Sequence, residues 1–112
     1  MNDKNKLYLS HILDSCRNIL EFIKDIDYNT FIKKRLIQSA VIRELEIIGE
    51  ATKNLSNDII NHSKEIPWKK LAGMRDKLIH GYFTVDLKEV WITTKKDITI
   101  LNKSIEKILA IR

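Results

Sequence analysis

Residues 67–86 read PWKKLAGMRDKLIHGYFTVD, and this stretch decides the fold. Proline suits the first turn of a helix, where its missing N–H is not needed, so Pro67 predicts a helix start. Leu71, Met74 and Leu78 follow at spacings of three and four and predict one buried helical face. Gly81 is well placed to end the helix. The stretch therefore predicts a helix that displays polar residues beside a buried stripe.

Two further helices are predicted before this stretch. Apolar residues recur at threes and fours over residues 3–24, which predicts the first helix. Asn29 or Thr30 can cap a second, central helix that runs to about Asn54. Gly49 lies inside that helix, where a glycine lowers the helix stability by roughly 1 kcal/mol relative to an alanine. We interpret Gly49 as a point of close approach by another helix, which a second subunit can supply.

The C-terminal part of the chain is also predicted to be helical. Asp86, with Glu89 three residues later, makes a capping-box-like start for one long last helix. The polar residues 55–65 leave room for at most a short helix around 56–61. One proline and three glycines in 112 residues leave little material for the tight turns of a sheet. The sequence predicts one all-α domain over residues 1–112, an antiparallel four-helix bundle with a short additional helix.

The composition indicates which binding partners and which cellular compartment to expect. Twenty Lys and Arg against fifteen Asp and Glu give a net charge of +5, which weakly favours a phosphate-bearing partner. Cys16 is the one cysteine, so an intrachain disulfide and a cysteine-based metal cluster are excluded. His11 and His62 lack a second ligand at metal spacing, and we expect neither a metal nor a cofactor. With no signal-like start and no membrane-length apolar segment, we expect a cytoplasmic protein and no membrane partner.

The polar residues of the central stretch suit phosphodiester chemistry. Arg75 and His80 are five positions apart, about 140° around a helix, so they do not share a face. Asp76 and His80 stand at i and i+4, where the carboxylate can orient the imidazole and favour its protonated form. Arg75 and Tyr82 stand at i and i+7, on the same side of a helix. The guanidinium group of Arg75 suits a phosphate, and the ring of Tyr82 can stack on a base. Metal-free RNA cleavage can use His80 for proton transfer and Arg75 to stabilise charge.

Simpler interpretations exist for the same features. On spacing alone, an arginine and a histidine near a helix end are more often a surface ion pair and an ordinary hydrogen-bonded histidine. Trp68 and Trp91 fall at helical spacing beside aliphatic residues, which favours a packing role. The basic runs at 33–35, 69–70 and 95–96 are usually solvated faces. They extend an RNA-binding rim only if the fold brings them near the motif.

The central helix contributes a further pair of charges. Glu46 and Glu50 stand at i and i+4, where two unpaired carboxylates would repel each other. We therefore expect at least one of them to pair with a basic residue such as Arg43 or Arg75.

The motif and its frame together closely resemble the DUF86 or HepT-like family of HEPN-domain proteins. The motif is Arg-x4-His-x-Tyr, at Arg75, His80 and Tyr82, and it lies in a frame of aliphatic, glycine and aromatic residues over residues 67–91. Residues 45–51, LEIIGEA, extend the resemblance into the central helix. The resemblance covers most of the chain.

This resemblance implies a two-fold homodimer of HEPN-like domains. Its Arg-x4-His motifs would face one another and form a composite, metal-independent ribonuclease site in a basic cleft, with Asp76 in support. His80 of one subunit would then work beside Arg75 of the other. The family also implies a toxin of a toxin–antitoxin pair that acts on RNA.

The resemblance further implies a protein partner, an MNT-type nucleotidyltransferase antitoxin. That antitoxin would neutralise the toxin by transferring AMP from ATP to the tyrosine of the motif, here Tyr82. The alternative is a non-catalytic, nucleotide- or substrate-binding partner subunit of a nucleotidyltransferase, in which the motif only grips phosphate.

Overall fold

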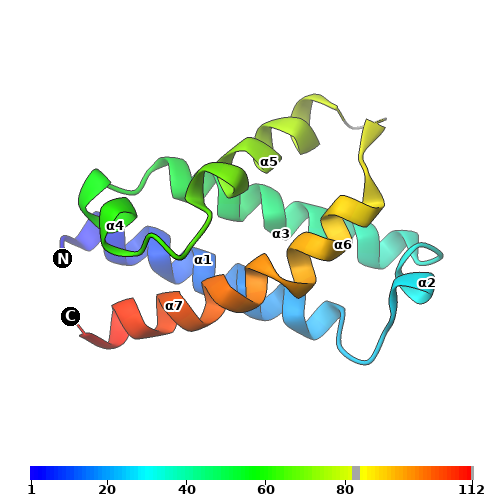
Figure 1. Cartoon of the computed structure of the whole chain (residues 1–112), viewed down its shortest axis with the longest axis horizontal. Coiled ribbons are helices and arrows are strands. Elements are labelled where there is room, and N and C mark those ends of the chain that lie inside the picture. The colour runs from blue at the N-terminus through cyan, green and yellow to red at the C-terminus, as the bar shows by residue number, and fades with distance from the viewer. Residues whose placement is uncertain (82–83, 112) are drawn as a thin grey trace.

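The computed structural model of the chain describes residues 1–81 and 84–111 (Figure 1). Its helices are α1 Asp3–Phe22, α2 Tyr28–Phe31, α3 Arg35–Lys53, α4 Asn57–His62, α5 Trp68–His80, α6 Leu87–Lys95 and α7 Asp97–Ile111. These described residues contain no strand. The expected all-α, HEPN-like fold is confirmed.

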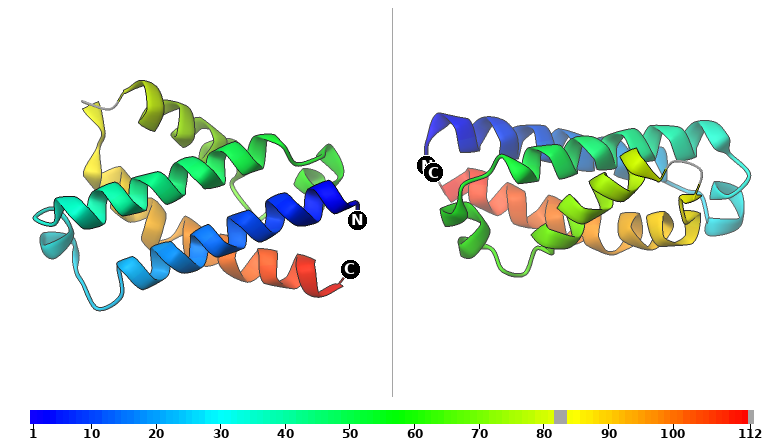
Figure 2. Two further views of the ribbon diagram at one scale, coloured as in Figure 1. Left: turned by 180° about the vertical axis from the view of Figure 1, so that it is seen from behind. Right: turned by 90° about the horizontal axis from the view of Figure 1, so that it is seen from above.

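The long helices surround one cluster of buried apolar side chains. α3 packs against both α1 and α5, and α7 packs against α1. α1 and α3 run in opposite directions, and α7 returns along α1, so the two termini lie at the same end of the molecule (Figures 1 and 2). α5 lies across α3 at an angle. The helical part of the stretch 67–86 therefore packs against α3, the main part of the predicted central helix.

α1 forms where the apolar repeat predicted it. The side chain of Asn2 caps the helix by accepting the N–H of Asn5 at 2.7 Å. Leu9, Ile12 and Ile19 are fully buried, as is the thiol of Cys16. Burial raises the pKa of Cys16 to about 12, because the apolar surroundings penalise the thiolate. Cys16 is therefore a protonated core residue.

The second predicted helix is divided into α2 and α3. Asp27 caps α2 upstream of the expected position, and its carboxylate accepts the N–H of Thr30 at 2.8 Å. Phe31 is fully buried against Trp91, with ring centroids 5.1 Å apart, and its carbonyl accepts the Nε2–H of Gln38 at 2.9 Å. The prediction of a single helix was wrong because this long-range anchor turns the chain before α3 begins.

Gly49 marks the closest approach between α3 and α5. A Cβ atom at this position would overlap Arg75 Cβ and lie 2.9 Å from Arg75 Cγ and 3.0 Å from the carbonyl oxygen of Leu71. The close approach predicted from the glycine is confirmed. The approaching helix is α5 of the same chain, so a second subunit is not needed to explain this contact.

We expect Gly49→Ala to lower the free energy of unfolding by about 1–3 kcal/mol, because overpacking forces the two helices apart. Gly73→Ala is the matched control, since a Cβ there meets no atom within 4 Å. That change should raise the stability by roughly 0.5–1 kcal/mol through helix propensity. Urea unfolding of both variants checks this. Equal stability of the two variants would show that the contact at Gly49 is unimportant.

α4 and α5 follow the predicted boundaries closely. α4 occupies the short helical stretch expected in the polar segment, and α5 begins directly after Pro67. Trp68 is buried, and its Nε1–H donates to the carbonyl of Ser63 at 3.0 Å, which confirms its packing role. Gly81 ends α5, and its N–H donates to the carbonyl of Lys77 at 2.8 Å.

The last predicted helix is divided into α6 and α7, which meet at Lys96. Asp86 caps α6 as predicted, and its carboxylate accepts two backbone N–H groups at 3.0 and 3.3 Å. At Lys96 the backbone leaves regular helical geometry, with φ −101° and ψ −64°. Asp97 begins α7 as a buried residue, with Oδ2 2.6 Å from Lys70 Nζ on α5. An ion pair between distant segments accompanies this break, so the regular apolar repeat gave no sign of it.

Candidate functional site

α5 carries three of the predicted site residues. Arg75 lies in the middle of the helix against α3, and 25% of its side chain is exposed. Asp76 follows with a half-exposed side chain. His80 is the last residue of the helix and is exposed, at the start of the connection to α6. Tyr82 lies outside the described residues, so its place in the site stays a prediction.

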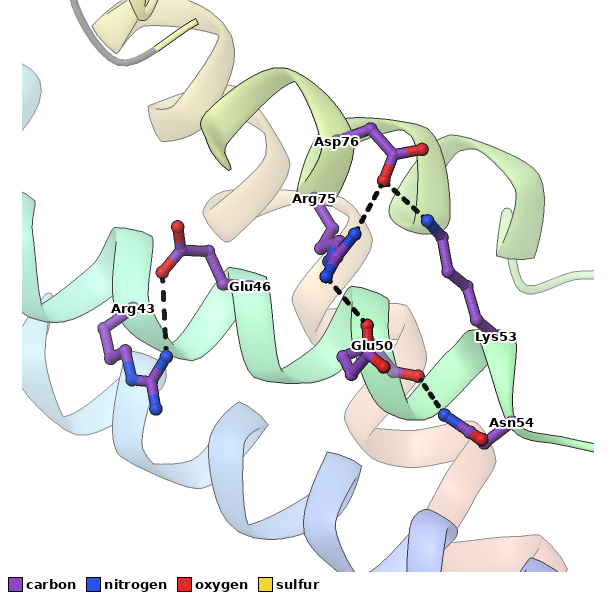
Figure 3. Close-up of polar contacts among 7 residues, drawn as sticks. All are labelled: Arg43, Glu46, Glu50, Lys53, Asn54, Arg75 and Asp76. Carbon is purple, nitrogen blue, oxygen red and sulfur yellow. Dashed lines mark hydrogen bonds and ion pairs between the residues drawn. The ribbon is translucent and has the colours of Figure 1, made fainter. Parts of the chain in front are cut away.

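Arg75 belongs to a charge cluster made of Glu50 and Lys53 from α3 and Arg75 and Asp76 from α5 (Figure 3). Arg75 Nη2 lies 3.0 Å from Glu50 Oε2, and Arg75 Nη1 donates to Asp76 Oδ1 at 3.0 Å. Lys53 Nζ donates to the same oxygen of Asp76 at 2.6 Å. The Nε of Arg75 is buried and finds no hydrogen-bond partner in the described part of the chain. Carboxylates from two helices thus fix the guanidinium.

The electrostatics of the charge cluster keep Asp76 ionised. The hydrogen bonds from Lys53 and then Arg75 hold the pKa of Asp76 below its usual range, although burial opposes them. A carboxyl group whose pKa is lower in the folded state than in the unfolded state stabilises the fold at pH values above its unfolded-state pKa. This stabilisation is lost as the pH falls through the folded-state pKa. The charge cluster therefore persists at pH values where an ordinary aspartate begins to protonate. Its two cations and two anions leave no net formal charge.

The interaction between Asp76 and His80 that their i and i+4 spacing allows is not formed. The carboxylate turns toward α3, where Lys53 and Arg75 supply charged donors, and charge-assisted hydrogen bonds are the stronger kind. The i and i+4 spacing along α5 did not reveal these competing donors from another helix.

The expectation for the two glutamates of α3 is confirmed. Glu50 pairs with Arg75, and Glu46 Oε1 lies 3.9 Å from Arg43 Nη1, so each carboxylate has its own cation (Figure 3).

Arg75 and His80 open into different hollows of the chain. The Arg75 hollow, of about 250 Å³, lies across α1, α3 and α5, and is also lined by Tyr8, His11 and Ile79. The His80 hollow, of about 470 Å³, lies between α5 and α6. Its apolar lining residues are Met74, Leu78, Val85 and Val90, and its charged ones are Lys77, Asp86 and Glu89. The prediction that Arg75 and His80 do not share a face is confirmed.

The sequence predicted no site role for Lys53, Tyr8 or His11, which lie near Arg75. Lys53 gave one signal, since it stands at i+3 from Glu50 and so on the same side of α3. His11, for which the sequence indicated no metal partner, lies in the Arg75 hollow edge-on to Tyr8, with ring centroids 6.3 Å apart. No pattern within α1 points to that hollow, because three helices form it.

The basic runs differ in their surroundings. Lys70 is paired with Asp97, and Lys95 Nζ lies 5.3 Å from the ring centroid of Trp91, so both support packing. The run at 33–35 is exposed at the start of α3.

Over residues 1–81 and 84–111, no three His, Cys, Asp or Glu side chains gather as they would around a metal ion. None of the described helices combines the length and the hydropathy that crossing a membrane requires.

Comparison with known proteins gives one consistent result. The family model described as "Ribonuclease HepT-like" matches residues 12–108. The chain is 46% identical over 108 residues to "Probable ribonuclease HepT" of Thermococcus cleftensis, covering 96% of this chain and 98% of that protein. It is 50% identical over 104 residues to a Methanocaldococcus jannaschii protein named as a "Putative RNase", covering 93% of this chain and 90% of that protein. No solved structure gives a significant match.

Proposed function

The chain belongs to the ribonuclease HepT-like family, and we propose that it is a metal-independent endoribonuclease that acts as the toxin of a toxin–antitoxin pair. Arg75 and His80 form its catalytic pair. Two copies of the chain complete the site in a two-fold homodimer. The observation that supports this proposal is that Arg75 and His80 open into different hollows, so a site that uses both side chains would draw on a second copy.

A second copy supplies what one copy lacks. In a two-fold dimer each contact occurs twice, so one interface creates two equivalent sites. Each site joins the Arg75 of one copy to the His80 of the other. Ile79, which lines the same hollow as Arg75, is 42% exposed and lies where a partner on this face would contact it.

The chemistry at this composite site is transfer of a phosphodiester within the RNA. Neutral His80 takes the proton of the ribose 2′-hydroxyl while the 2′-oxygen bonds to phosphorus. The bond from phosphorus to the 5′-oxygen breaks, and the leaving oxygen takes a proton from water. Arg75 stabilises the negative charge that develops on the phosphorane oxygens. The products are a 2′,3′-cyclic phosphate end and a 5′-hydroxyl end.

The alternative function is a non-catalytic binding subunit of a nucleotidyltransferase, whose Arg75 grips phosphate. The two functions differ in a simple assay. We expect the purified protein to cleave RNA in the presence of a chelator, to leave 2′,3′-cyclic phosphate ends, and to arrest growth when it is expressed alone. A binding subunit would retain RNA or nucleotide without cleavage and without growth arrest, and that result would overturn the ribonuclease proposal.

The proposed antitoxin is an MNT-type nucleotidyltransferase that adds AMP to Tyr82. The addition brings bulk and negative charge to a position two residues after His80, where it repels the phosphates of RNA. Incubation with this partner and ATP should raise the mass of the chain by whole AMP units and block cleavage. Tyr82→Phe should abolish the mass increase, whereas Tyr28→Phe, the control, should keep it. Equal modification of Tyr82→Phe would show that another residue is the acceptor.

A further inference from the structure

We propose that Lys53 is a second phosphate-contacting residue, which forms with Arg75 a two-cation clamp for the RNA backbone. In the free protein the carboxylate of Asp76 occupies this clamp, and a phosphodiester of RNA replaces it. The inference rests on the proposed function, because it assigns a backbone contact to the same RNA-cleaving site.

The geometry of the clamp is defined by one shared oxygen. Lys53 Nζ and Arg75 Nη1 donate to Asp76 Oδ1 at 2.6 and 3.0 Å, so two cations from different helices converge on a single anionic atom (Figure 3). A non-bridging phosphate oxygen carries the same partial charge and accepts the same donors. The convergence depends on the close crossing of α3 and α5, which Gly49 permits.

The shared oxygen is accessible to a ligand. The side chain of Lys53 is 37% exposed and that of Asp76 is 49% exposed, so the ion pair faces solvent. Exposed ion pairs are weak, because water screens the charges and both side chains lose freedom in forming them. A rotation of the Asp76 side chain therefore suffices to release the clamp. Arg75 stays in place meanwhile, since Glu50 holds its other terminal nitrogen at 3.0 Å.

The charges of the charge cluster favour this exchange. With Asp76 in the clamp, the two cations balance the two carboxylates of Glu50 and Asp76. When Asp76 turns away, the site carries one uncompensated positive charge, which a phosphodiester neutralises. Two lysines of α5, in contrast, are paired with carboxylates outside the charge cluster. Lys70 is bound to the buried Asp97, and Lys77 lies 3.7 Å from Glu89.

RNA binding to a cleavage-deficient protein tests the clamp. All variants carry His80→Ala, and the probe is a fluorescein-labelled single-stranded RNA titrated at several salt concentrations. Lys53→Gln should weaken binding roughly five- to tenfold and reduce the salt slope by about 0.7, the value for one phosphate contact on a single strand. Lys53→Arg should bind nearly as His80→Ala alone does, because it keeps the charge and the donors.

A matched control is Lys103→Gln on α7, which removes the same charge from an exposed site on a helix that packs against α1. Its RNA affinity should match that of the parent protein. Equal affinities of Lys53→Gln and Lys103→Gln would overturn the clamp, as would a parent protein that binds no RNA. Thermal melting of each variant separates lost affinity from lost folding.

Asp76→Asn provides an independent arm that does not depend on a lysine variant. Removing the internal anion should strengthen RNA binding roughly fivefold, since the phosphate no longer competes with a carboxylate. Weaker binding would show that Asp76 only holds the two cations in place, and would overturn the exchange.

If the protein with His80 intact fails to cleave RNA while these binding differences hold, the ribonuclease proposal fails and the clamp stands. If it cleaves RNA but Lys53→Gln changes nothing, the clamp alone fails.

Discussion

His80→Ala is expected to lower kcat/KM for RNA cleavage at least about a hundredfold, because it removes the group that takes the 2′-hydroxyl proton. His80 is exposed at the end of α5, so the change should leave the fold and its melting temperature almost unchanged. His62→Ala is the matched control, since His62 is also exposed at a helix end and lies on α4. Cleavage by His80→Ala at the wild-type rate would remove His80 from the mechanism.

Arg75→Ala should have a comparable effect for a different reason. The loss of a positioned donor to a developing oxyanion costs roughly a hundred- to a thousandfold in rate. Arg75→Lys keeps the charge but loses the planar fork that bridges Glu50 and Asp76, so we expect it to recover little activity. Full activity in Arg75→Lys would show that charge alone is needed.

Arg75→Ala needs a stability control, because Arg75 packs against Gly49 and holds the carboxylates of two helices. Urea unfolding distinguishes lost chemistry from a loosened contact between α3 and α5. Arg17→Ala removes an arginine whose ion pair with Glu106 is exposed, and it should retain both activity and stability.

Local sequence patterns predicted those parts of the fold that local physics determines. α1 and α5 begin and end close to the predicted residues, because an apolar stripe, a proline at the first turn and a glycine at the end act within one helix. The cap at Asp86 was predicted for the same reason. Gly49 predicted a close helix contact, because a glycine inside a helix lets a second helix approach its backbone closely.

The two wrong helix boundaries arise from contacts between distant segments. α2 and α3 separate where Phe31 is anchored on Trp91, and α6 and α7 separate where Asp97 pairs with Lys70. Neither contact leaves a trace in the apolar repeat of its own segment. Tertiary contacts such as these override local propensity.

Sequence patterns predicted the residues of the candidate site better than the contacts that those residues make. The helical angle between Arg75 and His80 predicted that they lie apart, and the two hollows confirm it. The partner of Asp76 was predicted along α5, but the structure supplies Lys53 from α3. Spacing within one helix describes neighbours on that helix, and the charge cluster lies between two.

Mixed dimers distinguish a site that joins Arg75 of one copy to His80 of the other from a site built within one copy. In a dimer of Arg75→Ala with His80→Ala, one composite site retains both side chains. If each site were built within one copy, both sites of that dimer would lack a catalytic group. Random exchange of subunits between the two inactive variants should therefore restore about a quarter of the wild-type activity.

The reciprocal mixture pairs wild-type chains with the double variant Arg75→Ala/His80→Ala. Its mixed dimers should be inactive, because each composite site then lacks one catalytic group.

The deciding measurement is the rate of RNA cleavage in both mixtures after subunit exchange, with dimer formation followed by sedimentation. We predict recovered activity in the mixture of single variants and inactive mixed dimers with the double variant. The opposite pattern, or full activity in a monomer, would contradict the composite site.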